Sequence, residues 1–154
     1  MVLAMNFSYW MFKTRVALRG YFERVRGALV DDGVFFLDCF GGFEAFRVLE
    51  ESTKNEGFTY VWDQADYNPV NGDILCHIHF RFRDGSQLRN AFTYDWRLWT
   101  IPEIRELLCE AGFQRTTVYW QTEDEDEETG EFEPVERADA DAGWICYISA
   151  EKRG

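Results

Sequence analysis

The chain has 154 residues, a length typical of one domain that can bury a core of its own. Six Trp, seven Tyr and fourteen Phe supply apolar surface, and 29% of the residues are charged, so the composition favours a globular protein over a disordered one. The formal net charge of −12 argues against general affinity for nucleic acid or anionic membrane, because phosphate binding needs a clustered basic face. The expected partners are therefore small molecules or proteins.

The first third of the chain predicts a βαβ unit. Val2–Met5 is a continuous apolar run, as in a strand that is covered on both faces. Apolar residues then recur at helical spacing from Ala17 to Leu29, and Val34–Asp38 follows as a second apolar strand. Such a unit implies two parallel strands with a right-handed crossover. The segment 43–52, with Phe43, Phe46 and Leu49 at helical spacing, predicts another helix.

In the middle third of the chain, the spacing of the apolar residues changes from helical to alternating. Phe58–Asp66, Ile74–Arg83 and Gln87–Trp96 alternate in period two and are separated by turn signals, which predicts an antiparallel β-meander over about 58–97. A helix follows, with Thr100 as N-cap, Glu103 three residues later and Gly112 after its end. Strands are expected at Phe113–Gln121 and Gly143–Ala150.

Between the last two strands lies the most acidic part of the chain. Nine of the fourteen residues in the segment EDEDEETGEFEPVE, Glu123 to Glu136, are acidic and none is basic. This composition predicts a solvated loop over about 122–141, with a site for a cation or a basic partner as the alternative.

Cysteine usage and the chain start predict a cytoplasmic protein. The four cysteines stand more than thirty residues apart, with no C-x-x-C motif and no His at zinc spacing, so buried free thiols in a reducing compartment are expected and no metal site. The apolar start has no basic leader or cleavage site and is too short to span a bilayer. No catalytic nucleophile or acid–base set can be recognised.

Both apolar strands end in unusual turns, NFSYW and DCFGG, which would face one crevice because adjacent parallel strands end at the same sheet edge. Asp38 could accept a hydrogen bond from an amine substrate or orient its turn. His77 and His79 could form a metal pair or part of a solvated basic face. A cluster before the third helix could hold a substrate or simply pack a core; its members are Tyr94, Trp96, Arg97 and Trp99.

Three stretches carry a resemblance to the C-terminal half of a class I S-adenosylmethionine-dependent methyltransferase. They are LAMNFSYW at 3–10, ALRGYFERVRGALVDDGVFFLDCFGG at 17–42 and RLWTIPEIRELLCEAGFQRTTVYW at 97–120. The resemblance covers nearly the whole chain and rests on the order and spacing of these motifs. It implies an α/β fold: a single domain, 1–154, with a partial Rossmann-like sheet of parallel strands plus one antiparallel strand and the meander inserted.

The resemblance also implies a cofactor, a site and a partner. The cofactor is S-adenosylmethionine, and Asn6, Phe7 and Ser8 match the motif at its reactive end; a packed aromatic turn with Ser8 as N-cap is the alternative. Tyr9 and Trp10 join Asp38 and the cluster as candidates for binding a small-molecule acceptor. The aromatic faces of Phe7, Tyr9 and Trp10, beside the strand end, would favour the sulfonium charge.

No G-x-G-x-x-G motif occurs in the sequence, so the cofactor site is expected to be incomplete and activity of the chain alone weak or absent. The strand at 2–6 would then expose an unpaired edge, to be covered by an N-terminal partner chain or by self-association. A truncated enzyme, one subunit of a split enzyme and a non-catalytic ligand- or protein-binding module remain alternatives.

Overall fold

The computed structural model describes residues 1–121 and 130–153, and the chain in it forms two compact units. The sheet–helix unit comprises Met1–Ala45 and Trp99–Gly154, and the meander unit comprises Phe46–Leu98. The prediction of a single domain is not tested by this division and stays a prediction. No helix in the described ranges is long and apolar enough to cross a membrane.

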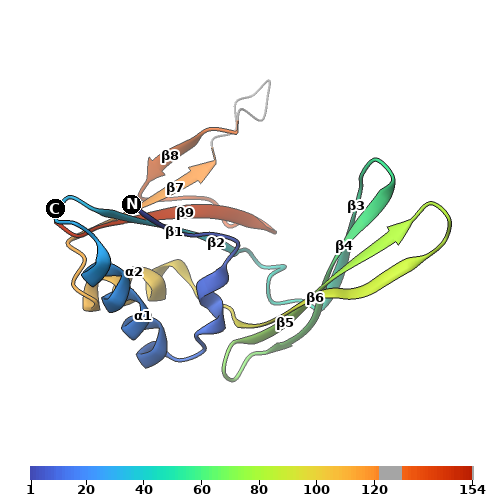
Figure 1. The fold of residues 1–154 in the computed structure, drawn as a ribbon, viewed down its shortest axis with the longest axis horizontal. Coiled ribbons are helices and arrows are strands. Elements are labelled where there is room, and N and C mark those ends of the chain that lie inside the picture. Colours follow the sequence, from blue (N-terminus) through green and yellow to red (C-terminus); the bar gives the residue numbers. More distant parts are fainter. Residues whose placement is uncertain (122–129, 154) are drawn as a thin grey trace. The chain divides into compact units, whose positions relative to one another are not determined.

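The sheet–helix unit contains a five-stranded sheet in the order β1-β2-β9-β7-β8 (Figure 1). Its strands are β1 (Val2–Ala4), β2 (Val34–Gly41), β7 (Arg115–Gln121), β8 (Phe132–Val135) and β9 (Trp144–Glu151). β1 runs parallel to β2, whereas β9 is antiparallel to both of its neighbours, β2 and β7. β1, β2 and β7 therefore point the same way and β9 opposes them, which confirms the predicted partial Rossmann-like sheet.

Two helices cover one face of this sheet (Figure 1). In α1 (Arg15–Ala28), Leu18, Phe22 and Val25 are buried, and the ring of Phe22 lies 5.8 Å from that of Phe35 on β2. α2 (Ile101–Glu110) begins with the predicted capping box: Thr100 accepts from the backbone of Glu103, whose side chain accepts in return. Burial of this apolar face stabilises the unit.

At the outer edge, β1 has β2 as its one neighbour among the strands that the structure describes. Leu3, in the middle of β1, is 55% exposed. The expectation of an unpaired strand edge is therefore confirmed for the described residues, whereas coverage of β1 on both faces is not observed in them.

The meander unit is a four-stranded antiparallel sheet in the order β3-β4-β5-β6 (Figure 1). Its strands are β3 (Leu49–Lys54), β4 (Phe58–Asn68), β5 (Asp73–Phe82) and β6 (Gln87–Arg97). The last three confirm the predicted meander. Register shifts between Gln64 and Asp66 and between Ile78 and Phe80 interrupt the ladders.

The helix expected over 43–52 is wrong. Its second half is β3, which pairs with β4, and Phe43 and Phe46 are 56% and 51% exposed. The open edge of β4 offers a full ladder of backbone hydrogen bonds, which outweighs the helical spacing of three apolar residues that find no core.

Two further expectations need correction. Within the acidic segment, 122–129 lies outside the described residues, but Phe132–Val135 forms β8 and pairs with β7, so the loop assignment is wrong there. Cys39, Cys76 and Cys146 are buried free thiols as predicted, whereas Cys109 on α2 is exposed.

Candidate functional site

The turn that follows β1 has an unusual backbone. Asn6 and Phe7 both lie in the left-handed region, at φ 56° and 55°. This region costs most residues other than glycine roughly 1–2 kcal/mol; asparagine enters it more readily, so the cost falls mainly on Phe7. Two such residues in succession persist only where other contacts hold them.

Asp38 on β2 supplies those contacts. Its Oδ2 accepts from the backbone N–H of Asn6 at 2.7 Å and its Oδ1 from that of Phe7 at 2.9 Å. The hydroxyl of Tyr9 donates to the Asp38 carbonyl oxygen, also at 2.7 Å. One residue of β2 thus fixes three groups of the turn, because parallel β1 and β2 bring their carboxyl ends together.

Burial governs the acidity of this carboxyl group. Asp38 is 5% exposed, and desolvation raises its pKa above the usual 3.8, while the hydrogen bonds from the backbone of Phe7 and Asn6 lower it in part. Of the two roles that the sequence left open for Asp38, the structure supplies the turn-orienting one. Contact with a substrate stays a prediction.

The five candidate residues of the segment NFSYW differ in their exposure to solvent. Asn6 and Ser8 are exposed and Phe7 is half-buried, so these three can meet a ligand. Tyr9 and Trp10 lie inside the 3₁₀ helix η1 (Ser8–Met11) and are 1% and 0% exposed. The N-cap of η1 is Phe7 without a side-chain cap bond, so the interpretation of Ser8 as N-cap is wrong.

Aromatic packing explains the burial of Tyr9 and Trp10. The ring of Trp10 lies 4.6 Å from that of Phe40 on β2 and 5.6 Å from that of Phe7, and Tyr9 packs on Phe22 at 6.0 Å. Phe7 in turn meets Phe40 edge-on at 4.8 Å. Of the aromatic residues in the turn, Phe7 is the one left accessible to a cation.

The two glycines after Phe40 are needed for close packing. A Cβ on Gly41 would collide with the Trp144 ring, and one on Gly42, at φ 108°, with the Ala142 carbonyl oxygen. Backbone N–H groups just beyond them donate to Asp141 and Ala142. These glycines therefore allow the chain to cross the start of β9, and they do not form a phosphate-binding loop.

The candidate cluster is divided between the two units. Trp99 belongs to the sheet–helix unit, where it is 1% exposed and its carbonyl oxygen accepts from Cys39 Sγ at 3.7 Å. Tyr94, Trp96 and Arg97 lie on β6 of the meander unit. The rings of Tyr94 and Trp96 stack at 4.3 Å, and Trp96 is 6% exposed. A substrate-binding role for these residues stays a prediction.

Two residues that sequence reasoning did not single out extend this aromatic surface. Trp62 on β4 lies 6.3 Å from Tyr94, ring to ring, and its Nε1 donates to Gln64 Oε1 at 3.3 Å. Gln64 is 6% exposed and its Nε2 donates to the Arg47 carbonyl oxygen. The period-two alternation already placed Trp62 and Gln64 on one face of their strand, but their pairing with β5 and β6 depends on register.

The histidines on β5 are engaged in hydrogen bonds. The Asn90 backbone N–H donates to His79 Nδ1 at 2.8 Å, which leaves Nε2 as the donor to Asp63 Oδ2 at 3.1 Å. His77 Nδ1 lies 3.0 Å from Thr93 Oγ1. No group of three or more candidate metal ligands occurs within the described ranges.

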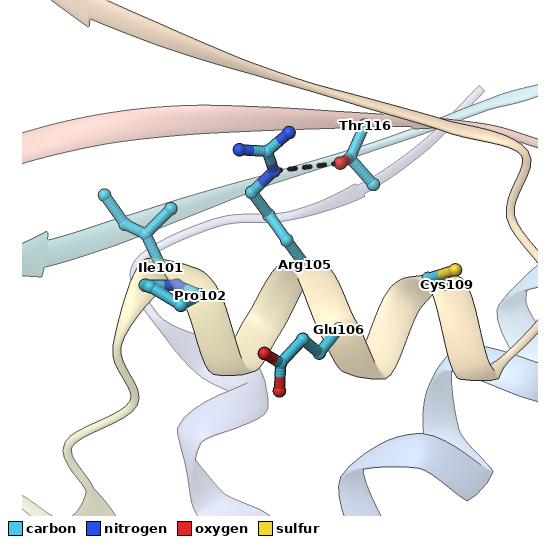
Figure 2. Close-up of a pocket in the computed structure, with 6 residues that line it drawn as sticks. All are labelled: Ile101, Pro102, Arg105, Glu106, Cys109 and Thr116. Atoms are coloured by element: carbon cyan, nitrogen blue, oxygen red, sulfur yellow. Dashed lines mark hydrogen bonds between the residues drawn. The ribbon is translucent and has the colours of Figure 1, made fainter. Parts of the chain in front are cut away.

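A cavity of 410 Å³ in the sheet–helix unit lies beside α2, and none of the candidate residues lines it (Figure 2). Ile101, Arg105 and Cys109 line it from the helix, and the Arg105 side chain reaches Thr116 on β7, with Nε donating to Oγ1 at 3.1 Å. The candidate turn is not part of this cavity, and its polar side chains Asn6 and Ser8 are exposed.

Comparisons with known proteins give a consistent result for the fold. No family model and no curated protein matches the sequence. Among solved structures, an S-adenosylmethionine-dependent methyltransferase from Clostridium acetobutylicum matches with a TM-score of 0.66 and 14% identity. The match covers 99% of this chain and 57% of that one. The chain has the fold of the C-terminal half of such methyltransferases.

Two further solved structures agree. The CcbJ methyltransferase from Streptomyces caelestis matches with a TM-score of 0.68 and 12% identity, over 99% of this chain and 57% of its own. The S-adenosylmethionine-bound amino pentose methyltransferase CalS10 from Micromonospora echinaspora matches with a TM-score of 0.54 and 12% identity, over 97% and 57%. The chain thus spans little more than half the length of the solved structures that it resembles.

The residues at the turn fit one end of S-adenosylmethionine. Exposed Asn6 and Ser8 offer an amide and a hydroxyl, and the half-buried ring of Phe7 offers a π face to a sulfonium. The sequence has no G-x-G-x-x-G loop to hold the rest of the cofactor. The exposed groups therefore suit the sulfonium end of the cofactor, and their contact with it stays a prediction.

Proposed function

We propose that this chain forms the acceptor-side half of an S-adenosylmethionine-dependent methyltransferase that acts on a small molecule, with little or no activity alone. The observation that carries the proposal is the turn held by Asp38 at the end of β1, which presents Asn6, Phe7 and Ser8 in a chain with a methyltransferase fold. The missing glycine-rich motif is the reason to expect weak activity.

In this proposal the turn places the cofactor. The bound cofactor supplies an electrophilic methyl group on a sulfonium. Asn6 and Ser8 would offer polar groups to that end of the cofactor, and the ring of Phe7, which packs on Phe40, would offer its face to the positive charge, a contact worth roughly 0.5–2 kcal/mol. Alignment supplies most of the acceleration in such a displacement, so Asp38 acts as a positioning residue.

The proposal includes a partner. β1 offers a backbone edge and the exposed Leu3 to another strand. A chain segment that carries the glycine-rich loop would pair there and complete the cofactor site. Self-association through the same edge is the competing arrangement.

The exposed apolar residues of the meander unit favour a second candidate, a non-catalytic binding module. Phe82, Leu88 and Phe92 are 43%, 51% and 54% exposed. Exposed apolar side chains of this kind mark surfaces that bind ligands or proteins. A ligand bound by the meander unit, with no response at Asn6–Ser8, would favour this candidate.

An NMR titration with S-adenosylhomocysteine at millimolar concentration tests the methyltransferase proposal, since it detects weak binding. We expect shifts at the amides of Asn6, Phe7 and Ser8. Asn6→Gly removes the amide and keeps the left-handed backbone without strain, so it isolates the side-chain contact. Asn6→Gly and Ser8→Ala should each weaken binding, whereas Ser52→Ala, on exposed β3, should not. Absence of shifts at the turn would overturn the proposal.

A further inference from the structure

The end of the meander unit contains a second cavity, of 290 Å³, that is unlike the rest of this acidic chain. Three cations line it: Lys54, Arg81 and Arg83. The sequence as a whole has 28 acidic residues against 16 Lys and Arg. A cavity lined by three cations is therefore a local reversal of the charge balance.

Strand register brings two of these cations and a hydroxyl group together. Lys54 on β3 pairs with Thr59 on β4, and Thr59 pairs with Arg81 on β5. Directly paired residues point to the same face of a sheet, so Lys54, Thr59 and Arg81 form one row across three strands. Arg83 lines the same cavity two residues beyond Arg81. The row is built by the backbone ladder and does not depend on a flexible loop.

Acidic groups neutralise only part of this charge. Arg81 Nη2 pairs with Glu50 Oε1 at 2.5 Å. Asp84 accepts from the backbone and hydroxyl of Ser86. No ion pair joins Lys54 or Arg83 to an acid within the part of the chain that the structure describes. Like charges on neighbouring strands repel, so this arrangement gains most from an added anion.

We propose that this cavity binds the phosphate group of a small phosphorylated molecule. Guanidinium groups bind phosphate oxygens in pairs, and a lysine ammonium and a threonine hydroxyl can donate to the others. Phe58 and Phe82, a register pair next to Thr59 and Arg81, also line the cavity, and period-two alternation directs their side chains to the face opposite the cationic row. The volume lies at the lower limit of ligand pockets, which favours a phosphomonoester over a large ligand.

This site does not depend on the proposed methyl-transfer function. All of its residues belong to the meander unit, and its loss would leave the turn after β1 unchanged. Failure of one proposal therefore says nothing about the other.

An NMR titration of the full chain with inorganic phosphate, against sodium chloride at equal ionic strength, tests the site. We expect saturable shifts at the amides of Thr59, Arg81 and Arg83 with phosphate alone. Lys54→Gln and Arg83→Gln each change an exposed side chain, and each should weaken binding about fivefold to tenfold. Arg89→Gln, an exposed cation of β6 outside the cavity, is the matched control and should bind like the wild type.

Further ligands distinguish the sources of the phosphate group. Glycerol 3-phosphate binding more tightly than inorganic phosphate supports a phosphorylated metabolite, and equal binding supports a free phosphate site. The proposal is overturned if phosphate gives no saturable shifts, if the Arg89→Gln control loses as much affinity as Arg83→Gln, or if a glutamate-rich peptide binds while phosphate does not.

Discussion

In the sheet–helix unit one buried carboxylate holds the candidate turn, whereas in the meander unit backbone ladders and ring stacking hold the candidate aromatic residues. Asp38 fixes two strained residues through hydrogen bonds across 31 and 32 positions of the chain. Tyr94 and Trp96 lie on one strand, two residues apart, and stack at 4.3 Å. Substitution of Asp38 alone should therefore disrupt the turn. Substitution of one aromatic residue in the meander unit should remove only part of that unit's stability.

The largest expected effect follows substitution of Trp10. Because this side chain is fully buried against Phe40, Trp10→Ala should lower the free energy of unfolding by about 3–5 kcal/mol. Trp62→Ala, at a half-buried position of the meander unit, should cost about 1–2 kcal/mol. Urea denaturation monitored by circular dichroism measures both. Equal losses would contradict the packing role of Trp10.

A smaller effect is expected at Asp38. Asp38→Ala leaves the N–H groups of Asn6 and Phe7 without their acceptor, so it should lower the free energy of unfolding by about 1–3 kcal/mol. Asp63→Ala, which removes the half-buried partner of His79 in the meander unit, should cost about 1 kcal/mol or less, because one charge-assisted contact is lost and no backbone N–H is left without an acceptor. Urea denaturation measures both losses. A larger loss of unfolding free energy for Asp63→Ala than for Asp38→Ala would show that the Asp38 carboxylate does not hold the turn.

The Asp38 effect should depend on pH in a defined direction. Burial raises the folded-state pKa of Asp38 above the usual 3.8, so its stabilising contribution is full below that value and is lost as pH rises through the folded-state pKa. The stability difference between the wild type and Asp38→Asn should therefore shrink as pH rises from strongly to weakly acidic. Urea denaturation across this range checks it, and a difference that grows with pH would contradict the direction.

Thiol labelling should distinguish the buried cysteines from the exposed one. We expect it to leave the free energy of unfolding unchanged. Cys109 is exposed, whereas burial raises the pKa of Cys76 to about 12 and raises that of Cys39. Brief treatment of the native protein with iodoacetamide, followed by mass spectrometry, should modify Cys109 first. Labelling of Cys39 or Cys76 at the same rate would show that their surroundings open.

Sequence patterns predicted the elements whose signals are local. Period-two alternation located β4, β5 and β6, and the Thr100–Glu103 capping box located the start of α2. β3 and β8 were missed because each is stabilised by a neighbouring strand edge, which composition does not reveal.

The candidate site could be predicted only in part for the same reason. The adjacency of NFSYW and Asp38 followed from parallel strands that end at one edge. That Asp38 would bind the backbone of Asn6 and Phe7, and that Tyr9 and Trp10 would be buried, depends on the left-handed turn. No local pattern specifies such a turn without glycine.

The most direct test of the proposed half-site is calorimetric titration of the isolated chain with S-adenosylmethionine and S-adenosylhomocysteine. Because the proposal assigns only one end of the cofactor to the turn, it predicts a dissociation constant of about 1 mM or weaker. Binding in the low micromolar range by the chain alone would contradict it.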